Sequence, residues 1–180
     1  MTMARSESLQ ARLAIVAEHV NRENQHDLDG IMRTFGATAR YDDEPWAAHY
    51  AGRDEVRTFY AELLRAMPDL HIDIRQRHVA DEAVVLEVVI TGHQLGAWRG
   101  LPATGRRVDF PLCAVFTFDE GDRLAGEKIY YDRATVLRQL GVFHEPDGMV
   151  GRITAVLAHP LTMARIAGRT VFSARRAERT

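Results

Sequence analysis

The sequence predicts an α+β fold in which helices pack on one face of a curved antiparallel sheet. Residues 8–67 contain three segments whose apolar residues recur at the spacing of an α-helix. After Pro68 the apolar residues alternate instead, and long alternating segments follow one another with short turns between them. A helix layer and a sheet arranged in this way can enclose one cavity between them.

Three helices are expected before Pro68. The first spans residues 8–23, with apolar residues at Leu9, Leu13, Val16, Ala17 and Val20. The second begins at Asp27 and ends at Gly36. The third, residues 53–67, is strongly amphipathic, and Pro68 ends it.

Strands are expected over residues 37–43, 70–80, 83–98, 106–118 and 123–132. Residues 44–52 form a loop or a short strand. Turn-forming residues separate the later strands at Asp81–Glu82 and at residues 119–122, and glycine and proline punctuate a loop at residues 100–107.

Composition restricts the function classes. The 180 residues fit a single domain, and the net charge of −2 gives no general reason to expect nucleic-acid binding. Cys113 is the only cysteine, so neither an intrachain disulfide nor a cysteine metal site is possible. The eight histidines show no paired metal-ligand spacing, and no phosphate-binding glycine motif is present, so we expect no metal and no cofactor. The N-terminus lacks a signal peptide and no apolar run would span a membrane, which predicts a cytoplasmic protein.

The C-terminal residues differ in charge from the rest of the chain. Residues 149–180 contain six arginines and one acidic residue, Glu178, whereas residues 1–148 are acidic overall. We expect residues 149–180 to form helical pieces broken at Pro160 and Gly168, as an extension of a domain at 1–148. This extension is expected to pack against the body or a second subunit; binding at a membrane surface is the alternative.

The segment Tyr130–Gly141 changes period partway, from a strand that ends at Tyr131 to a helix that begins at Arg133. Asp132 lies at the junction, where an aspartate is a favoured helix N-cap. Strand alternation places Lys128, Tyr130 and Asp132 on one face of the sheet. Asp132 is therefore either a helix cap or the acid/base of an active site.

Three segments resemble the SnoaL-like polyketide cyclase (ester cyclase) family of the nuclear transport factor 2-like superfamily. They are AGRDEVRTFYAELLRAMPDLHIDI, TGHQLGAWRGLPATGRRV and FDEGDRLAGEKIYYDRATVLRQLG, and the resemblance extends over residues 10–145. It implies a cone-shaped α+β barrel whose mouth opens into an apolar pocket, and a dimer or tetramer formed through the sheet.

The resemblance also implies an activity. Asp132 matches the essential aspartate of family members that close rings, so it is expected to be the acid/base of an intramolecular aldol condensation on an apolar carbonyl compound, as a lyase or isomerase. An apolar pocket would raise its pKa. His93 or Gln94, at the end of the long strand, would donate a hydrogen bond to the enolate oxygen. Tyr130 is a further donor in this hypothesis.

Two other hypotheses remain open. Counting back from the third helix matches Asp43 to the catalytic base of the related ketosteroid isomerases, and His19 to their oxyanion tyrosine, so an isomerase or epoxide hydrolase would use Asp43. Ala114 stands where the isomerases place a second donor. A non-catalytic binding protein would instead leave both aspartates in solvent. The residues expected to shape the pocket are Tyr41, Trp46, Tyr60, Trp98 and Phe116, beside Tyr130 and Gln94.

Overall fold

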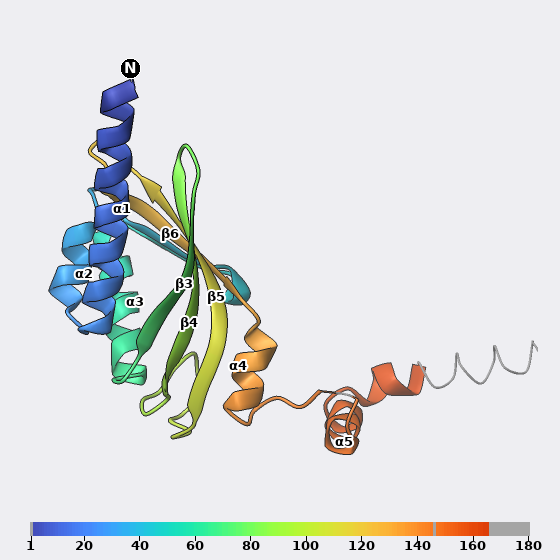
Figure 1. Ribbon diagram of the computed structural model, residues 1–180. Helices are drawn as coiled ribbons and strands as arrows, with labels where there is room; N and C mark the ends of the chain where they lie inside the picture. The colour runs from blue at the N-terminus through green and yellow to red at the C-terminus, as the bar shows by residue number, and fades with distance from the viewer. Residues whose placement is uncertain (1, 146, 166–180) are drawn as a thin grey trace, which may run out of the picture. The chain divides into compact units, whose positions relative to one another are not determined.

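A mixed β-sheet forms one layer of the molecule, and helices α1, α2 and α3 cover one of its faces (Figure 1). The structure is a computed structural model that describes residues 2–145 and 147–165. The helices are α1 (Thr2–Asn24), α2 (Leu28–Thr34), the 3₁₀ helix η1 (Glu44–Trp46), α3 (Arg53–Ala66), α4 (Arg133–Gln139) and α5 (Met149–Ala158). The strands are β1 (Arg40–Asp43), β2 (Ala48–Ala51), β3 (His71–Val79), β4 (Ala83–His93), β5 (Arg107–Phe118) and β6 (Leu124–Tyr131).

The six strands lie in the order β2-β1-β6-β5-β4-β3. β1 runs parallel to β6, and every other neighbouring pair is antiparallel. The edge strands β2 and β3 do not pair with each other, so the sheet is open. The predicted α+β class is confirmed: α1 and α2 precede β1, α3 lies between β2 and β3, and consecutive strands from β3 to β6 pair as antiparallel hairpins. The long strand ends at His93, five residues before the predicted end.

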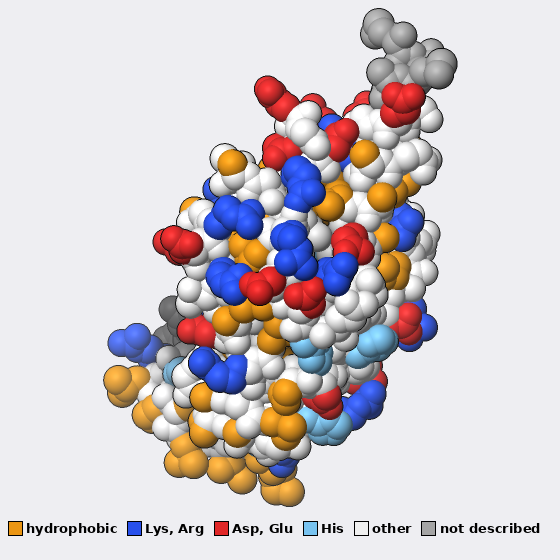
Figure 2. Space-filling view, turned by 90° about the vertical axis from the view of Figure 1, so that its left-hand side faces the viewer, with side chains coloured by type: hydrophobic (Ala, Val, Ile, Leu, Met, Phe, Trp, Pro, Cys, Tyr) orange, Lys and Arg blue, Asp and Glu red, His pale blue; other side chains and the backbone are white. Residues whose placement is uncertain are grey.

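Periodic burial explains why these segments adopt their structures. On α3, Val56, Phe59 and Tyr60 are buried on one side of an otherwise exposed helix. On β4, Val84, Leu86, Val88 and Ile90 are buried at alternate positions and face the helices. Full burial of each such side chain contributes roughly 1.5–3 kcal/mol. The outer surface of the helical layer carries interspersed basic and acidic side chains instead (Figure 2).

The register between β1 and β6 places the polar residues of the interior. Tyr41 pairs with Glu127, and Asp43 pairs with Ile129. Because side chains alternate along a strand, these β1 residues and Glu127, Ile129 and Tyr131 of β6 all face the helical layer. Two acidic residues therefore point into the interior from adjacent strands.

Residues 141–180 form a separate unit from residues 1–140. Within it, α5 ends at Ala158, and helical backbone resumes over residues 160–165, so the predicted interruption at Pro160 is confirmed. Gly168, the second predicted break, lies outside the described residues. No helix in the described ranges has the length and apolar character needed to cross a lipid bilayer. The predicted packing or membrane role of residues 149–180 stays a prediction.

Candidate active site

A cavity of about 100 Å³ lies between the helices and the sheet. Most of its wall is apolar. The lining residues are Val20, Glu23, Tyr41, Asp43, Phe59, Leu63, Met67, Leu70, Ile72, Leu86, Val88, Ile90, Gln94, Trp98, Val108, Phe110, Leu112, Ala114, Phe116, Glu127, Ile129, Tyr131, Val136 and Leu140. Leu63, Trp98, Leu112, Tyr131 and Val136 keep partial exposure, so the cavity approaches the surface between α3, the loop after β4, and α4. The volume is well below the roughly 300–1,000 Å³ of pockets for drug-sized ligands, so it suits a ligand, or part of one, about the size of one ring.

Asp43, at the end of β1, is one of the acidic residues of the cavity wall. Its side chain is almost fully buried, and Oδ2 accepts a hydrogen bond from Arg99 at 2.6 Å. Its other oxygen, Oδ1, is buried without a hydrogen-bond partner, as is Nε of Arg99. A buried polar atom without a partner costs about 1–3 kcal/mol, and native proteins leave few such atoms. An unpaired acceptor and an unpaired donor side by side are suited to a polar group of a ligand.

A braced loop holds Arg99 in this position. Leu95 and Gly96 donate backbone hydrogen bonds to the Ala66 carbonyl at the end of α3. A side chain at position 96 would meet the Arg65 carbonyl oxygen at 2.6 Å, so only glycine allows this close approach. Trp98 and Leu101 pair with each other across a two-residue turn. Arg99 is the first residue of this turn and has a positive φ of 50°. This conformation is rare outside glycine, so the surrounding contacts hold Arg99 in a strained backbone.

Aromatic rings surround the Arg99 guanidinium. Its central carbon lies 5.0 Å from the ring centroid of Trp98, 5.5 Å from Trp46, and 5.9 Å from both Tyr50 and Phe59. Cations at these distances are attracted to the negative face of each ring. The rings also keep water from the Asp43–Arg99 pair, which strengthens its electrostatic interaction.

Burial and the neighbouring cation act on Asp43 in opposite directions. Burial raises the pKa of the Asp43 carboxyl above its ordinary value, and the Arg99 charge and hydrogen bond lower it; the net shift is upward. The Trp46 amide and the Tyr131 hydroxyl also lower it, without meeting hydrogen-bond geometry. A carboxylate with a raised pKa is a stronger base than one in water, yet Arg99 favours its ionised form.

A second polar group in the cavity wall comes from α1 and β6. Glu23 of α1 and Glu127 of β6 both line the wall, and both are buried. His19, one turn before Glu23, is fully buried behind them, with Nε2 at 3.2 Å from Glu127 Oε2 and 3.6 Å from Glu23 Oε2. Tyr60 of α3 donates a 2.5 Å hydrogen bond to Glu127 Oε2. We call these four residues the inner cluster.

Hydrogen-bond donors and acceptors fix the protonation of His19. The Thr34 hydroxyl donates to the Ile31 carbonyl, so it accepts from Nδ1 of His19 at 2.7 Å. Because Tyr60 gives its proton to Glu127, Nε2 of His19 faces only oxygen acceptors. Oxygen atoms at both ring nitrogens favour the imidazolium form of His19. Consistent with this, the pKa of His19 is raised: burial lowers it, but Glu23 and Glu127 together outweigh the burial.

The carboxyl of Glu23 is held in its neutral form. Burial and the charge of Glu127 raise its pKa, His19 and Tyr60 lower it, and the net result is a pKa of about 8. The oxygen and nitrogen atoms of His19, Glu23 and Glu127 lie within 4.8 Å of one another, close enough to surround a cation. Here His19 and Glu127 share a hydrogen bond, and Glu23 lies 3.6 Å from His19. One imidazolium, one carboxylate and one carboxylic acid in these positions together carry no net charge.

Asp132, the predicted acid/base, lies outside this cavity. It is the N-cap of α4, and its carboxylate accepts hydrogen bonds from the backbone of Ala134 and Thr135 and from the Thr135 hydroxyl. The side chain is exposed, and these hydrogen bonds lower its pKa. The expectation of a raised pKa in an apolar pocket is wrong, because the cavity lies on the other face of β6. Tyr130 shares the outer face and is also exposed.

His93 and Gln94 have separate structural roles at the end of β4. Nδ1 of His93, a half-exposed side chain, lies 2.6 Å from Asp69, outside the cavity lining. Gln94 lines the cavity, but its amide donates to the carbonyls of Gly96 and Pro102, and its oxygen accepts from Thr104. These contacts brace the loop that carries Arg99, so they occupy the amide that was expected to bind the enolate.

The predicted aromatic residues divide into two groups. Tyr41, Trp98 and Phe116 line the cavity. Tyr60 is buried in the inner cluster, and Trp46 lies beside the opening, where Nε1 donates to the Tyr131 hydroxyl at 2.7 Å. The hypothesis of a purely binding protein required both aspartates to face solvent, and Asp43 does not.

Sequence reasoning missed Glu23, Glu127 and Arg99. Glu127 shares a strand face with Ile129, so the alternation that was used for Asp132 would have found it on the opposite face. Glu23 follows His19 by one helical turn, which puts both on one side of α1. Arg99 gave no usable signal, since an arginine in a glycine-rich loop is normally exposed.

Comparisons with known proteins agree with this fold. A family model described as SnoaL-like polyketide cyclase matches residues 13–140. A SnoaL-like polyketide cyclase structure from Jannaschia sp. CCS1 has a TM-score of 0.67 at 22% identity and covers 73% of this chain and 92% of its own. None of the curated proteins compared with the chain is a significant match.

Two further solved structures have the same fold at low identity. A protein of ketosteroid isomerase-like fold from Catenulispora acidiphila, in complex with trimethylamine, has a TM-score of 0.60 at 21% identity and covers 75% of this chain and 96% of its own. SalBIII is an epoxide hydrolase/cyclase-like enzyme with a role in pyran ring formation in the polyether salinomycin. It has a TM-score of 0.59 at 20% identity and covers 69% of this chain and 92% of its own.

Proposed function

Because the chain belongs to the SnoaL-like polyketide cyclase family, we propose that it is an acid/base enzyme that acts on an apolar carbonyl compound, with Asp43 as the base. The observation that carries the proposal is the unpaired Oδ1 of Asp43, buried in the wall of an apolar cavity. This oxygen has no hydrogen-bond partner within the protein, whereas both oxygens of Asp132 already accept hydrogen bonds.

The proposed first step is removal of a proton from the carbon beside a carbonyl group. Oδ1 of Asp43 takes the proton, while Arg99 holds Oδ2 and so orients the carboxylate. The electron pair of the broken C–H bond forms a C=C bond, and the carbonyl π electrons move to oxygen. The enolate then either takes the proton back from Asp43 at another carbon, which is isomerisation, or attacks a second carbonyl, which closes a ring. In ring closure the π pair of the second carbonyl moves to its oxygen, and this alkoxide takes the proton from Asp43. The step uses only side chains of this protein.

The size of the cavity favours a compact reacting unit. A single ring or a short chain fills about 100 Å³, so a larger substrate would place only its reacting end inside. Isomerisation of a β,γ-unsaturated ketone needs the least space, and cyclohex-3-enone is the simplest test compound. Its conversion to cyclohex-2-enone is followed by ultraviolet absorbance, and the proton transfer by deuterium uptake from heavy water.

The discriminating experiment compares Asp43→Asn with Asp132→Asn. Removal of a general base reduces the rate by about 10²–10⁴-fold, so we expect a loss of this size for Asp43→Asn. Asn is also a good N-cap, so Asp132→Asn should change kcat by less than about twofold. The reverse pattern would return the active site to Asp132. Equal activity of all three proteins would refute acid/base catalysis by either aspartate.

Opening of an apolar epoxide is a second candidate function. The observation that favours it is the pair of carboxyl groups in one cavity, since Asp43 could activate water while an acidic group protonates the epoxide oxygen. Incubation with cyclohexene oxide in ¹⁸O-labelled water tests it. Formation of labelled diol that depends on Asp43, without isomerisation of cyclohex-3-enone, would favour the hydrolase.

A further inference from the structure

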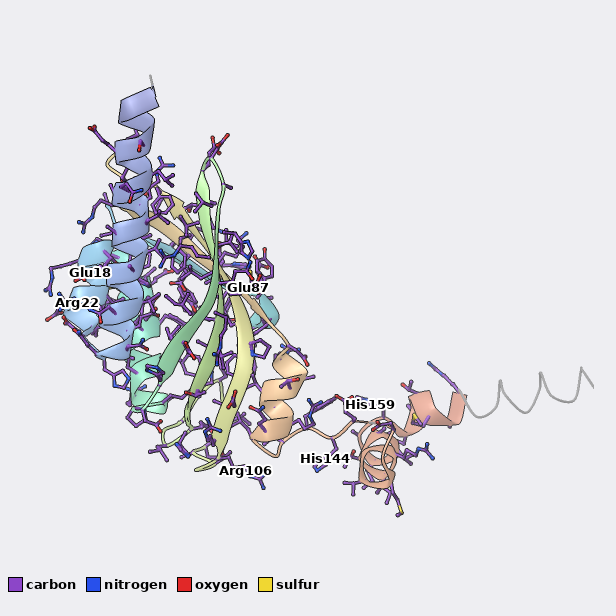
Figure 3. The ribbon with its side chains drawn as sticks, in the orientation of Figure 1. Glu18, Arg22, Glu87, Arg106, His144 and His159 are labelled. Atoms are coloured by element: carbon purple, nitrogen blue, oxygen red, sulfur yellow. The ribbon has the colours of Figure 1, made fainter. Side chains whose placement is uncertain are left out.

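Glu23 is a carboxyl group in the cavity wall to which the proposed step assigns no role. It is buried, lines the same cavity as Asp43, and comes from the helical layer rather than from the sheet. Glu18, five residues earlier on α1, forms a half-exposed ion pair with Arg22 on the side of the helix turned away from the sheet (Figure 3). One face of α1 therefore carries ordinary surface acids, and the opposite face places a carboxyl group in an apolar cavity.

Burial and the charge of Glu127 favour the protonated form of Glu23, whereas His19 and Tyr60 oppose it. Four titratable groups face Glu23. They are His19 on its own helix, Glu127 on β6, Tyr60 on α3, and Tyr41 on β1. Tyr60 commits its proton to Glu127, and His19 contacts Glu127 more closely than Glu23. Glu127 therefore has the closer hydrogen-bond partners. Glu23 keeps its proton, and the pKa of about 8 agrees with this distribution.

The strand register gives the backbone spacing between Asp43 and the inner cluster. Glu127, beside Glu23, pairs in register with Tyr41, which is two residues before Asp43 on β1. Two residues of a strand span roughly 7 Å. A ketone that contacts Asp43 with its acidic C–H and the inner cluster with its oxygen needs a similar span, because each hydrogen bond adds about 3 Å.

We propose that Glu23 is a second catalytic residue, a neutral carboxylic acid that donates its hydrogen bond, and then its proton, to the carbonyl oxygen of the substrate. The inference rests on the proposed function of Asp43. As Asp43 takes the carbon-bound proton, the C–H electron pair forms the C=C bond, the carbonyl π pair moves to oxygen, and Glu23 supplies the proton of the resulting enol. In isomerisation, the enol returns that proton to Glu23, and Asp43 delivers its proton to the distant carbon. His19 and Tyr60 are positioning residues, because they act through Glu127 and Glu23.

Infrared difference spectroscopy of the full chain tests the proton on Glu23 without any substrate. The expected result is a band of a protonated carboxyl group at pH 7, which disappears as the pH is raised through about 8 and is absent from Glu23→Gln. The matched control, Glu18→Gln on the opposite face of α1, should keep the band. Absence of the band from the unchanged protein, or its persistence in Glu23→Gln, overturns the proposal.

Binding of cyclohex-2-enone tests the hydrogen bond to the ligand. Glutamine keeps an N–H donor at position 23 and leucine does not. We expect Glu23→Leu to bind the ketone about 3–10-fold more weakly and to lose the downward shift of its carbonyl stretching frequency, while Glu23→Gln keeps most of both. Equal weakening in the two variants would show that the residue only fills space. If Glu23→Leu does not fold, an unshifted carbonyl frequency in the unchanged protein or in Glu23→Gln still refutes the donor role.

The experiments separate failure of this inference from failure of the proposed function. Turnover that depends on Asp43, in a protein without the infrared band, refutes the role of Glu23 and leaves Asp43 as the base. A band and a shifted carbonyl frequency without turnover refute the isomerase and leave a ketone-binding donor. Elemental analysis of the purified chain adds a third outcome: one equivalent of a divalent metal that Glu23→Gln loses would identify the inner cluster as a metal site and overturn the acid role.

Discussion

Asp43 and Asp132 occupy comparable positions at the ends of β1 and β6, two neighbouring strands that run parallel. Each aspartate is the N-cap residue of a short helix, η1 after Asp43 and α4 after Asp132. The carboxylate of Asp132 turns back onto the amides of its helix and stays in solvent. The carboxylate of Asp43 makes no such cap and points into the core.

This difference determines what each carboxylate can do. Hydrogen bonds lower the pKa of Asp132, whereas burial raises the pKa of Asp43. Both oxygens of Asp132 accept hydrogen bonds, which stabilise its ionised form. Asp43 has one oxygen without a hydrogen-bond partner, in a site with little water. Residue type and position at a strand end do not distinguish them, so the surrounding packing makes the difference.

Replacement of Glu23, the second carboxyl group of the cavity, should have the largest effect on the free energy of unfolding. Its folded pKa of about 8 exceeds the ordinary 4.5, so the folded state holds the proton more tightly than the unfolded state. Stability then falls as pH rises between these values, by up to about 1.4 kcal/mol per pH unit. Glutamine cannot titrate, so the free energy of unfolding of Glu23→Gln should not show this fall. Relative to the unchanged protein, it should therefore increase as the pH rises from 5 to 8. Urea unfolding across this range measures the change, and a difference that is independent of pH would contradict it.

Removal of Arg99 should affect Asp43 strongly. Arg99→Met leaves a buried carboxylate without its cation, which costs about 3 kcal/mol when the group is ionised. Without Arg99 the pKa of Asp43 rises further, so protonation relieves the cost as pH falls. Unfolding by urea should therefore show a large loss of stability at pH 8 and a smaller one at pH 5. The control variant is Arg138→Met, which removes a partner of Thr135 beside Asp132 and should not show this pH dependence. If Arg99→Met loses the same stability at pH 5 and pH 8, Asp43 is not a buried charge that depends on Arg99.

The smallest effect is expected at Asp132. Asp132→Ala removes the cap of α4, which should lower Tm by about 2–4 °C because two backbone amides lose an acceptor. The lowered pKa of Asp132 means that its contribution is present at neutral pH and is lost as pH falls through the folded pKa. Calorimetry at pH 7 and pH 3 measures both changes. A pronounced loss of turnover in this variant would show that Asp132 takes part in catalysis, contrary to the assignment of Asp43 as the base.

The sequence by itself determined the local elements. The apolar spacing of α3 and the alternation of β4 reproduce the observed burial, since both patterns depend on residues that are neighbours within one element. Alternation also divided β6 correctly into two faces, one with Tyr130 and Asp132 and the other with Ile129 and Tyr131. Counting from α3 placed Asp43 among the candidate residues.

Only the tertiary structure decided which face of β6 is inside. α1 and α3 cover the face that bears Glu127, and so convert a residue that reads as a surface charge into part of a buried cluster with His19 and Tyr60. Arg99 reaches Asp43 across 56 positions of the sequence through a strained turn. Burial and pKa depend on what other segments bring into contact, and a periodic pattern carries information only about its own segment.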